Sequence, residues 1–181
     1  MLRIKIPSVE VFNEKDSTFN KLFDDTVLQL EHSLVSVSKW ESKWNKPFLS
    51  KNEEKTPEQL LDYIKCMTLT QNVNPEVYKY IPTDVMKAIS KYIEAPMTAT
   101  TFREDDSKKN NEIITNEIIY YWMVSFNIPF ECQKWHLNRL LTLIRVCSIK
   151  NAPQKKMSAR EIMSRNKALN KARRAQLNTR G

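Results

Sequence analysis

The sequence contains a single glycine, Gly181, among 181 residues. Turns with positive φ, and loops that bring the backbone close to a phosphate, usually require glycine because a Cβ atom would clash there. The chain therefore has no phosphate-binding loop, no dinucleotide-binding glycine motif and no glycine-flanked nucleophile. These absences exclude large enzyme classes and favour a non-catalytic protein.

The basic residues are concentrated near the C-terminus. The net charge is +8, and from Arg145 onward eleven Lys and Arg face one acid, Glu161. Residues 145–181 thus carry +10, which leaves −2 for residues 1–144. A polyanionic partner, if there is one, is therefore expected at the C-terminal segment.

The cysteines are Cys66, Cys132 and Cys147. Their odd number and the lack of a Cys-x-x-Cys spacing argue against a disulfide framework and a zinc site. The N-terminus does not resemble a signal peptide, and the longest apolar run, residues 118–124, is far shorter than the roughly 20 residues of a membrane span. We expect reduced cysteines, no metal, no cofactor and no membrane segment.

The N-terminal segment alternates apolar and polar residues. Leu2, Ile4 and Ile6 predict a strand that continues through residues 9–12, and residues 26–32 supply its antiparallel partner. The stretch between the two would be the connection, although residues 17–23 could themselves pair or form a helical turn. The sequence therefore predicts an N-terminal β-hairpin.

Two helices are predicted after the hairpin. The first covers residues 33–45 and should end before Pro47. The second starts at Thr56, where Pro57 in the first turn and Gln59 three residues after the cap complete a capping box.

A third helix is predicted over residues 84–94, with Thr83 as its cap. Residues 95–111 have no helical period and predict a loop, in which residues 98–102 could form a short strand. The charged cluster at residues 103–109 is interpreted as a solvated part of this loop.

The apolar content is highest between residues 111 and 149. Residues 111–126 predict the central buried helix, with a strand as the alternative, because apolar side chains point all round from residue 118. Residues 131–149 predict an amphipathic helix. The pair is expected to form an antiparallel helical hairpin that makes the core.

A last helix begins after the linker 150–156, with Ser158 and Glu161 as a second capping box. It presents apolar residues on one face and a basic ridge within about 60° on another. The basic ridge consists of Arg160, Lys167, Lys171 and Arg174. Protein docking is the favoured use of this helix, and nucleic-acid binding is the alternative.

The predicted fold class is α+β and mainly helical: a β-hairpin packed on a helical domain over residues 1–149, followed by a linker and basic helical arm over residues 150–181. His32 and His136 lack an acid or cysteine at ligand spacing, so we interpret both as core histidines. The candidate partner-binding residues in the first domain are Trp40, Trp44, Trp135 and Arg139.

Three segments, residues 30–49, 129–147 and 157–178, resemble small proteins from the tail morphogenesis region of tailed phages. The closest functional class is the tail assembly chaperone of long-tailed phages, many of which share a late aromatic-rich helix comparable to Trp135, Leu140 and Leu141. This class has no catalytic residues to carry over. A basic C-terminal helix is not a required feature of it.

The resemblance implies a non-catalytic function in the host cell cytoplasm. Such a chaperone coats the tape-measure protein, shields its apolar surface and recruits tail-tube subunits, and self-association is expected of it. The alternatives are a virion structural component, such as a head–tail or tail-completion protein, and a basic nucleic-acid-binding regulator.

Overall fold

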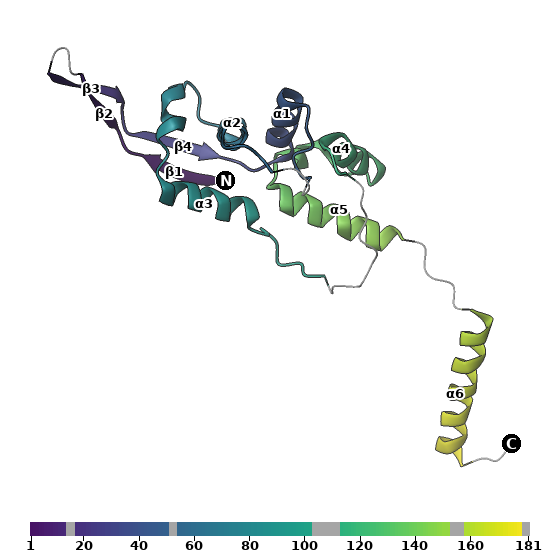
Figure 1. The fold of residues 1–181 in the computed structure, drawn as a ribbon. Coiled ribbons are helices and arrows are strands. Elements are labelled where there is room, and N and C mark those ends of the chain that lie inside the picture. Colours follow the sequence, from purple (N-terminus) through teal and green to yellow (C-terminus); the bar gives the residue numbers. More distant parts are fainter. Residues whose placement is uncertain (14–16, 51–53, 103–112, 153–157, 179–181) are drawn as a thin grey trace. The chain divides into compact units, whose positions relative to one another are not determined.

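The computed structural model describes residues 1–13, 17–50, 54–102, 113–152 and 158–178. The chain divides into two compact units, which we call the body (residues 1–148) and the arm (residues 149–181). The fold is α+β and mainly helical, so the predicted class is confirmed (Figure 1). In chain order the elements are β1 (Leu2–Ile6), β2 (Val9–Asn13), β3 (Thr18–Phe23), β4 (Thr26–Leu30), α1 (Leu34–Trp44), α2 (Pro57–Met67), η1 (Pro75–Tyr80), α3 (Thr83–Glu94), α4 (Asn116–Ser125), η2 (Phe130–Lys134), α5 (Leu137–Asn151) and α6 (Ala159–Leu177).

The N-terminal hairpin consists of two antiparallel ladders. Strand β1 pairs with β4, with Leu2 opposite Leu30, and β2 pairs with β3, with Asn13 opposite Thr18. Where the ladders separate, the Ser8 backbone N–H donates to the Asp25 carboxylate at 2.8 Å. The prediction of a hairpin is confirmed, and so is the option that residues 17–23 pair with the preceding strand.

The core lies where the β1–β4 ladder meets the helices. On the free edge of β4, the Glu31 and Leu69 backbone N–H groups bond to Met67 and Gln29 at 2.9 and 2.8 Å, so the chain after α2 covers this edge. Helix α3 packs against β1, and α1 packs against α2. The largest fully buried side chains are Trp40, Tyr63, Ile6, Leu28, Leu30, Leu34, Met67, Ile89, Ile119, Met123, Leu137 and Leu140.

The predicted capping box of α2 is confirmed. The Thr56 hydroxyl accepts the Gln59 N–H at 3.3 Å, and the Gln59 side-chain oxygen accepts the Thr56 N–H at 3.0 Å. Helix α1 also forms as predicted. It is ended by Asn45, which takes the left-handed conformation at φ 51°, and not by Pro47 as expected.

Two details of the segment around α3 differ from the prediction. Thr83 is the first helical residue rather than the cap, because extended Pro82 occupies the cap position and offers no side-chain hydrogen bond. Residues 98–102 form no strand. The charged cluster at residues 103–109 lies outside the described residues.

The prediction of a helix within residues 111–126 is confirmed, but the prediction that this helix is buried on all sides is wrong. Helix α4 starts only at Asn116, and its buried residues are Asn116, Ile119 and Met123. Tyr121 and Val124 are 67% and 59% exposed. The apolar side chains point all round, as the sequence indicates, but only one side of this helix meets the core.

The predicted helix over residues 131–149 is divided into η2 and α5. His136 pairs with Ser33 in an isolated antiparallel bridge, and the Leu137 N–H donates to the His32 carbonyl at 2.7 Å. This backbone pairing holds Trp135 extended and stops the helix from starting earlier. The expected α4–α5 helical hairpin therefore does not make the core by itself. The two helices contribute Ile119, Met123, Leu137 and Leu140 to a core that is shared with β1, β4, α1 and α2.

Asparagine takes the place of glycine at most backbone positions that need positive φ. Among the described residues these positions are Ser17, Asn45, Asn72, Met97, Asn127 and Asn178. Asparagine tolerates the left-handed region because its short polar side chain bonds locally to the backbone. A chain almost without glycine can thus still form turns and helix ends.

Candidate binding surfaces

The two tryptophans of α1 have different environments. Trp40 is only 1% exposed, and its indole N–H donates to the Gln59 carbonyl at 2.9 Å. The prediction that Trp40 meets a partner is therefore corrected: it is a core residue. Trp44 is half-buried and donates its indole N–H to the Asp62 carboxylate at 2.9 Å.

Asp62 ties α2 to the end of α1. Its second carboxylate oxygen accepts from the ammonium of Lys43. Burial acts to raise the pKa of Asp62, but the hydrogen bonds from Lys43 and Trp44 outweigh it and hold the pKa below its usual value. The polar edge of Trp44 is thus used inside the body, and only part of its ring remains accessible.

Trp135 and Arg139 form one surface feature at the start of α5. The guanidinium of Arg139 lies 4.2 Å from the centre of the half-buried Trp135 ring. This cation–π contact covers one ring face. The structure brings these two predicted residues together.

Paired aromatic rings lie on the β2–β3 ribbon. Phe12 and Phe19 are cross-strand neighbours with ring centroids 5.2 Å apart, and Phe19 is 70% exposed. Val11 is also exposed, but it precedes Phe12 in the strand and therefore points to the opposite face of the ribbon. This aromatic pair was not predicted from the sequence, although apolar residues on both strands of a two-stranded ribbon are a signal for it. We call Phe12 and Phe19 the ribbon patch.

A second apolar patch lies on α4 and η2. Tyr121, Val124 and Phe130 are exposed, and so are the charged residues of the same two elements, Glu117, Glu131 and Lys134. We call these six residues the α4–η2 surface. It too was missed, because the sequence pattern indicated burial on all sides.

The arm contains α6, a complete helix with a cap at each end. Ser158 and Glu161 form the predicted capping box, and Asn178 ends the helix at φ 52°. The hydrogen bond that the Glu161 carboxylate accepts from the Ser158 N–H lowers the pKa of Glu161. Arg160, Lys167, Lys171 and Arg174 are all exposed on it. The exposed apolar residues of α6 are Ile162, Met163, Leu169 and Leu177.

The two histidines meet in the core, which the sequence did not indicate. Their ring centroids are 5.0 Å apart. His32 Nδ1 bonds with the Tyr63 hydroxyl at 2.5 Å, and His136 Nε2 donates to the Tyr92 carbonyl at 3.0 Å. Burial, with the neighbouring His136 charge, lowers the pKa of His32 to about 3, and burial also lowers the pKa of His136. Both side chains are core residues, as expected.

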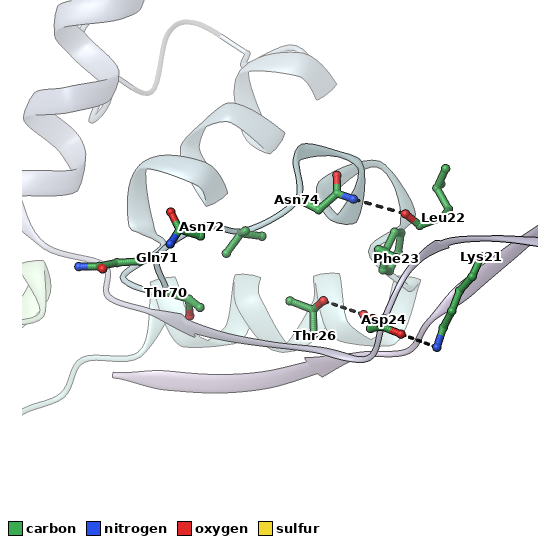
Figure 2. A pocket seen from close by; sticks show the side chains of 10 residues that line it. Lys21, Leu22, Phe23, Asp24, Thr26, Thr70, Gln71, Asn72 and Asn74 are labelled. Atoms are coloured by element: carbon green, nitrogen blue, oxygen red, sulfur yellow. Dashed lines mark hydrogen bonds and ion pairs between the residues drawn. The ribbon is translucent and has the colours of Figure 1, made fainter.

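A cavity of about 490 Å³ lies between the β3–β4 junction and residues 70–74 (Figure 2). Its charged residues, Lys21 and Asp24, form an ion pair. The backbone carbonyl of Asp24 accepts a hydrogen bond from the Thr26 hydroxyl at 2.7 Å. The Asn74 amide donates to the Leu22 carbonyl at 3.4 Å. The lining therefore offers surface hydrogen-bonding groups but no acid–base pair poised for chemistry.

The described part of the chain contains no group of three or more His, Cys, Asp and Glu residues arranged to hold a metal ion. The three cysteines are free, and burial raises the pKa of the Cys66 thiol. No described helix combines the length and apolar character that a bilayer crossing requires.

No protein family model, curated protein or solved structure matches the chain.

Proposed function

We propose that this protein is a non-catalytic assembly factor of a tailed phage, a tail assembly chaperone that binds the tape-measure protein in the host cytoplasm and recruits tail-tube subunits. The resemblance of residues 30–49, 129–147 and 157–178 to phage tail-morphogenesis proteins supports the phage context. The ribbon patch carries the binding role, because Phe12 and Phe19 present an aromatic pair to solvent. Exposed apolar patches of this kind mark protein interaction sites.

The patch is suited to shielding a partner that exposes apolar side chains before assembly. Residues of the two strands pair from Val9 opposite Phe23 to Asn13 opposite Thr18, so the backbone that holds the rings is ordered. Phe23, at the base of the ribbon, is buried and anchors β3 in the core. An anchored ribbon with aromatic residues near its turn can bury them on a helical partner without losing its own fold.

The experiment is co-expression with a fragment of the phage tape-measure protein. The wild-type chain is expected to move the fragment into the soluble fraction and to co-purify with it. The double variant Phe12→Ser and Phe19→Ser is expected to lose this effect. Leu60→Ser on α2 is the matched control, since it also removes an exposed apolar side chain but lies outside the patch.

A fragment that is as insoluble with the wild-type chain as without it rejects the chaperone proposal. Retention of the effect in the double phenylalanine variant rejects the ribbon patch as its site. Mass spectrometry of purified virions separates the chaperone from a virion structural component, because a chaperone is absent from finished particles and a head–tail or tail-completion protein is present.

The basic ridge of α6 favours a second candidate function, nucleic-acid binding. Arg160, Lys167, Lys171 and Arg174 project from one face of a fully exposed helix, where they could contact successive phosphates. The test is DNA and RNA binding between 50 and about 200 mM salt. This function requires an affinity that falls steeply with salt and disappears when residues 157–181 are deleted.

A further inference from the structure

The β2–β3 ladder is a ribbon of only two strands. Among the described residues, each of these strands has the other as its one hydrogen-bonded neighbour. Phe12 and Phe19 are exposed on one face of the ladder, and Val11 and Asn20 are exposed on the other. A two-stranded hairpin is at best marginally stable in water, and further strands or a packed face are needed to stabilise it. An added strand would therefore stabilise this part of the body.

The outer edge of β3 is obstructed. The pairing register of the ladder skips Leu22, which lies opposite no residue of β2. The Leu22 carbonyl instead accepts a hydrogen bond from the Asn74 side-chain amide at 3.4 Å, and η1 packs against β3. Irregular pairing and a covering segment are two means by which proteins protect a strand edge from another chain. An added strand is therefore not expected beside β3.

The outer edge of β2 lacks this protection. The strand contains neither proline nor lysine, and its one charged residue is Glu10. Glu10, Val11 and Phe12 are all exposed. An edge strand of this kind presents backbone N–H and C=O groups to another strand. Glu10 lies opposite Lys21 in the ladder, so a cation is already beside its charge.

The sequence of β2 is also complementary to itself. In an antiparallel pair of two β2 strands centred on Val11, Val11 lies opposite the partner's Val11, and Glu10 lies opposite the partner's Phe12. No charge then lies directly opposite a like charge, which would be destabilising. Because side chains alternate between the faces of a sheet, Phe12 and Phe19 of both ribbons lie on one face of the combined sheet. A second copy of the chain therefore supplies a strand that fits.

We propose that two copies of this chain associate through the outer edges of β2, in an antiparallel pair centred on Val11. The product is a four-stranded sheet in the order β3–β2–β2–β3, which has enough strands for independent stability. Pairing of identical edges about a two-fold axis closes at the dimer and does not continue into a filament. This inference goes beyond tape-measure binding and stands independently of it, because association needs no further component.

The test is sedimentation velocity on the nuclease-treated full-length protein at several concentrations, in about 150 mM salt. Val11→Lys and Val11→Glu each place two like charges opposite each other across the two-fold axis. Asn20→Lys is the matched control, because Asn20 is the exposed cross-strand neighbour of Val11 on the same face of the ribbon but lies on β3. Val11→Thr keeps the β-branched shape without adding a charge.

The wild type, the Asn20→Lys control and Val11→Thr are expected to reach twice the 21.4 kDa chain mass. Val11→Lys and Val11→Glu should each weaken dimerisation about tenfold, because like charges directly opposite each other repel. An equimolar mixture of these two variants should recover the dimer, since lysine then faces glutamate. Circular dichroism on each variant separates lost association from lost folding.

Three results would overturn the proposal. The first is a wild-type chain that stays monomeric at every concentration. The second is an equal loss of association in Val11→Lys and Asn20→Lys, since this assigns the contact to a face of the ribbon instead of the β2 edge. The third is a mixture of folded Val11→Lys and Val11→Glu chains that stays monomeric, since this excludes the pairing of Val11 with its own copy.

Discussion

The imidazole rings of His32 and His136 pack edge to face in the core of the body, with ring centroids 5.0 Å apart. His136 Nε2 donates to the Tyr92 carbonyl, which leaves Nδ1 as an acceptor, and this buried atom has no hydrogen-bond partner among the described residues. The Tyr92 hydroxyl in turn donates to Glu31 at 2.6 Å, and the Met1 amino group pairs with the same carboxylate at 2.9 Å. Both rings are neutral in this arrangement.

This pair predicts acid sensitivity. Burial lowers the folded-state pKa of His32 to about 3, whereas the unfolded chain protonates it near its ordinary value of 6.5. Between these values the unfolded state binds the extra proton, so stability falls as the pH drops below 6.5. Holding His32 neutral costs about 1.4 kcal/mol between pH 7.5 and 5.5. The lowered pKa of His136 acts in the same direction. Urea denaturation at these two pH values measures the loss, and His32→Gln should remove the His32 share. Equal stability of the wild type at both values would refute this assignment.

The buried carboxylate of Glu41 connects α1 to the start of α4. It accepts the Phe48 N–H at 2.7 Å and two N–H groups of Asn116. Glu41→Gln replaces an acceptor by a donor and should lower the free energy of unfolding by about 2–3 kcal/mol. Denaturant titration checks this, with Glu58→Gln as the control because the Glu58 side chain is exposed on α2. Equal free energies of unfolding for the two variants would show that the hydrogen bonds of Glu41 do not stabilise the fold.

Met97 occupies the left-handed region at φ 50°, where a side chain is unfavourable. Met97→Gly removes this strain and increases the freedom of the unfolded chain, so a net stabilisation of about 0.5–1 kcal/mol is expected. Met97→Val should destabilise, because a β-branched residue fits this region poorly. Thermal unfolding of both variants tests the assignment, and the opposite order of their melting temperatures contradicts it.

Helix α6 depends on its own caps, because none of its residues is buried. Ser158→Ala removes the side-chain oxygen that accepts the Glu161 N–H at 3.2 Å and should cost the helix about 1 kcal/mol. Ser164→Ala, inside the same helix, should increase helicity instead. Cα chemical shifts of residues 159–177 report both effects. Unchanged shifts in the Ser158 variant would mean that tertiary contacts hold the helix.

The local signals were readable in the sequence. Alternation along β1 and β4 predicts the hairpin, and the capping boxes at Thr56 and Ser158 predict two helix starts to within one residue. These features depend on neighbouring residues and on hydrogen bonds within one turn. The α+β class follows from them, because in these segments the local preference agrees with the final fold.

The long-range features were not readable. Trp40 and Trp44 lie four residues apart, on the same side of α1. Only Trp40 is fully buried, and this difference depends on how α1 packs on its neighbours. The bridge between Ser33 and His136 interrupts a segment that reads as continuous helix. The outward face of α4 is apolar like its inward face, so its hydrophobicity could not indicate exposure.

The central claim, that this chain shields a tape-measure protein, is tested most directly with purified components. A tape-measure fragment is diluted from denaturant, and light scattering at about 350 nm is followed with increasing amounts of the chain. Scattering is expected to fall as the chain is added and to level off at a fixed ratio, and it is expected to stay high with the variant that carries Phe12→Ser and Phe19→Ser. Scattering that is the same with and without the wild-type chain would contradict it.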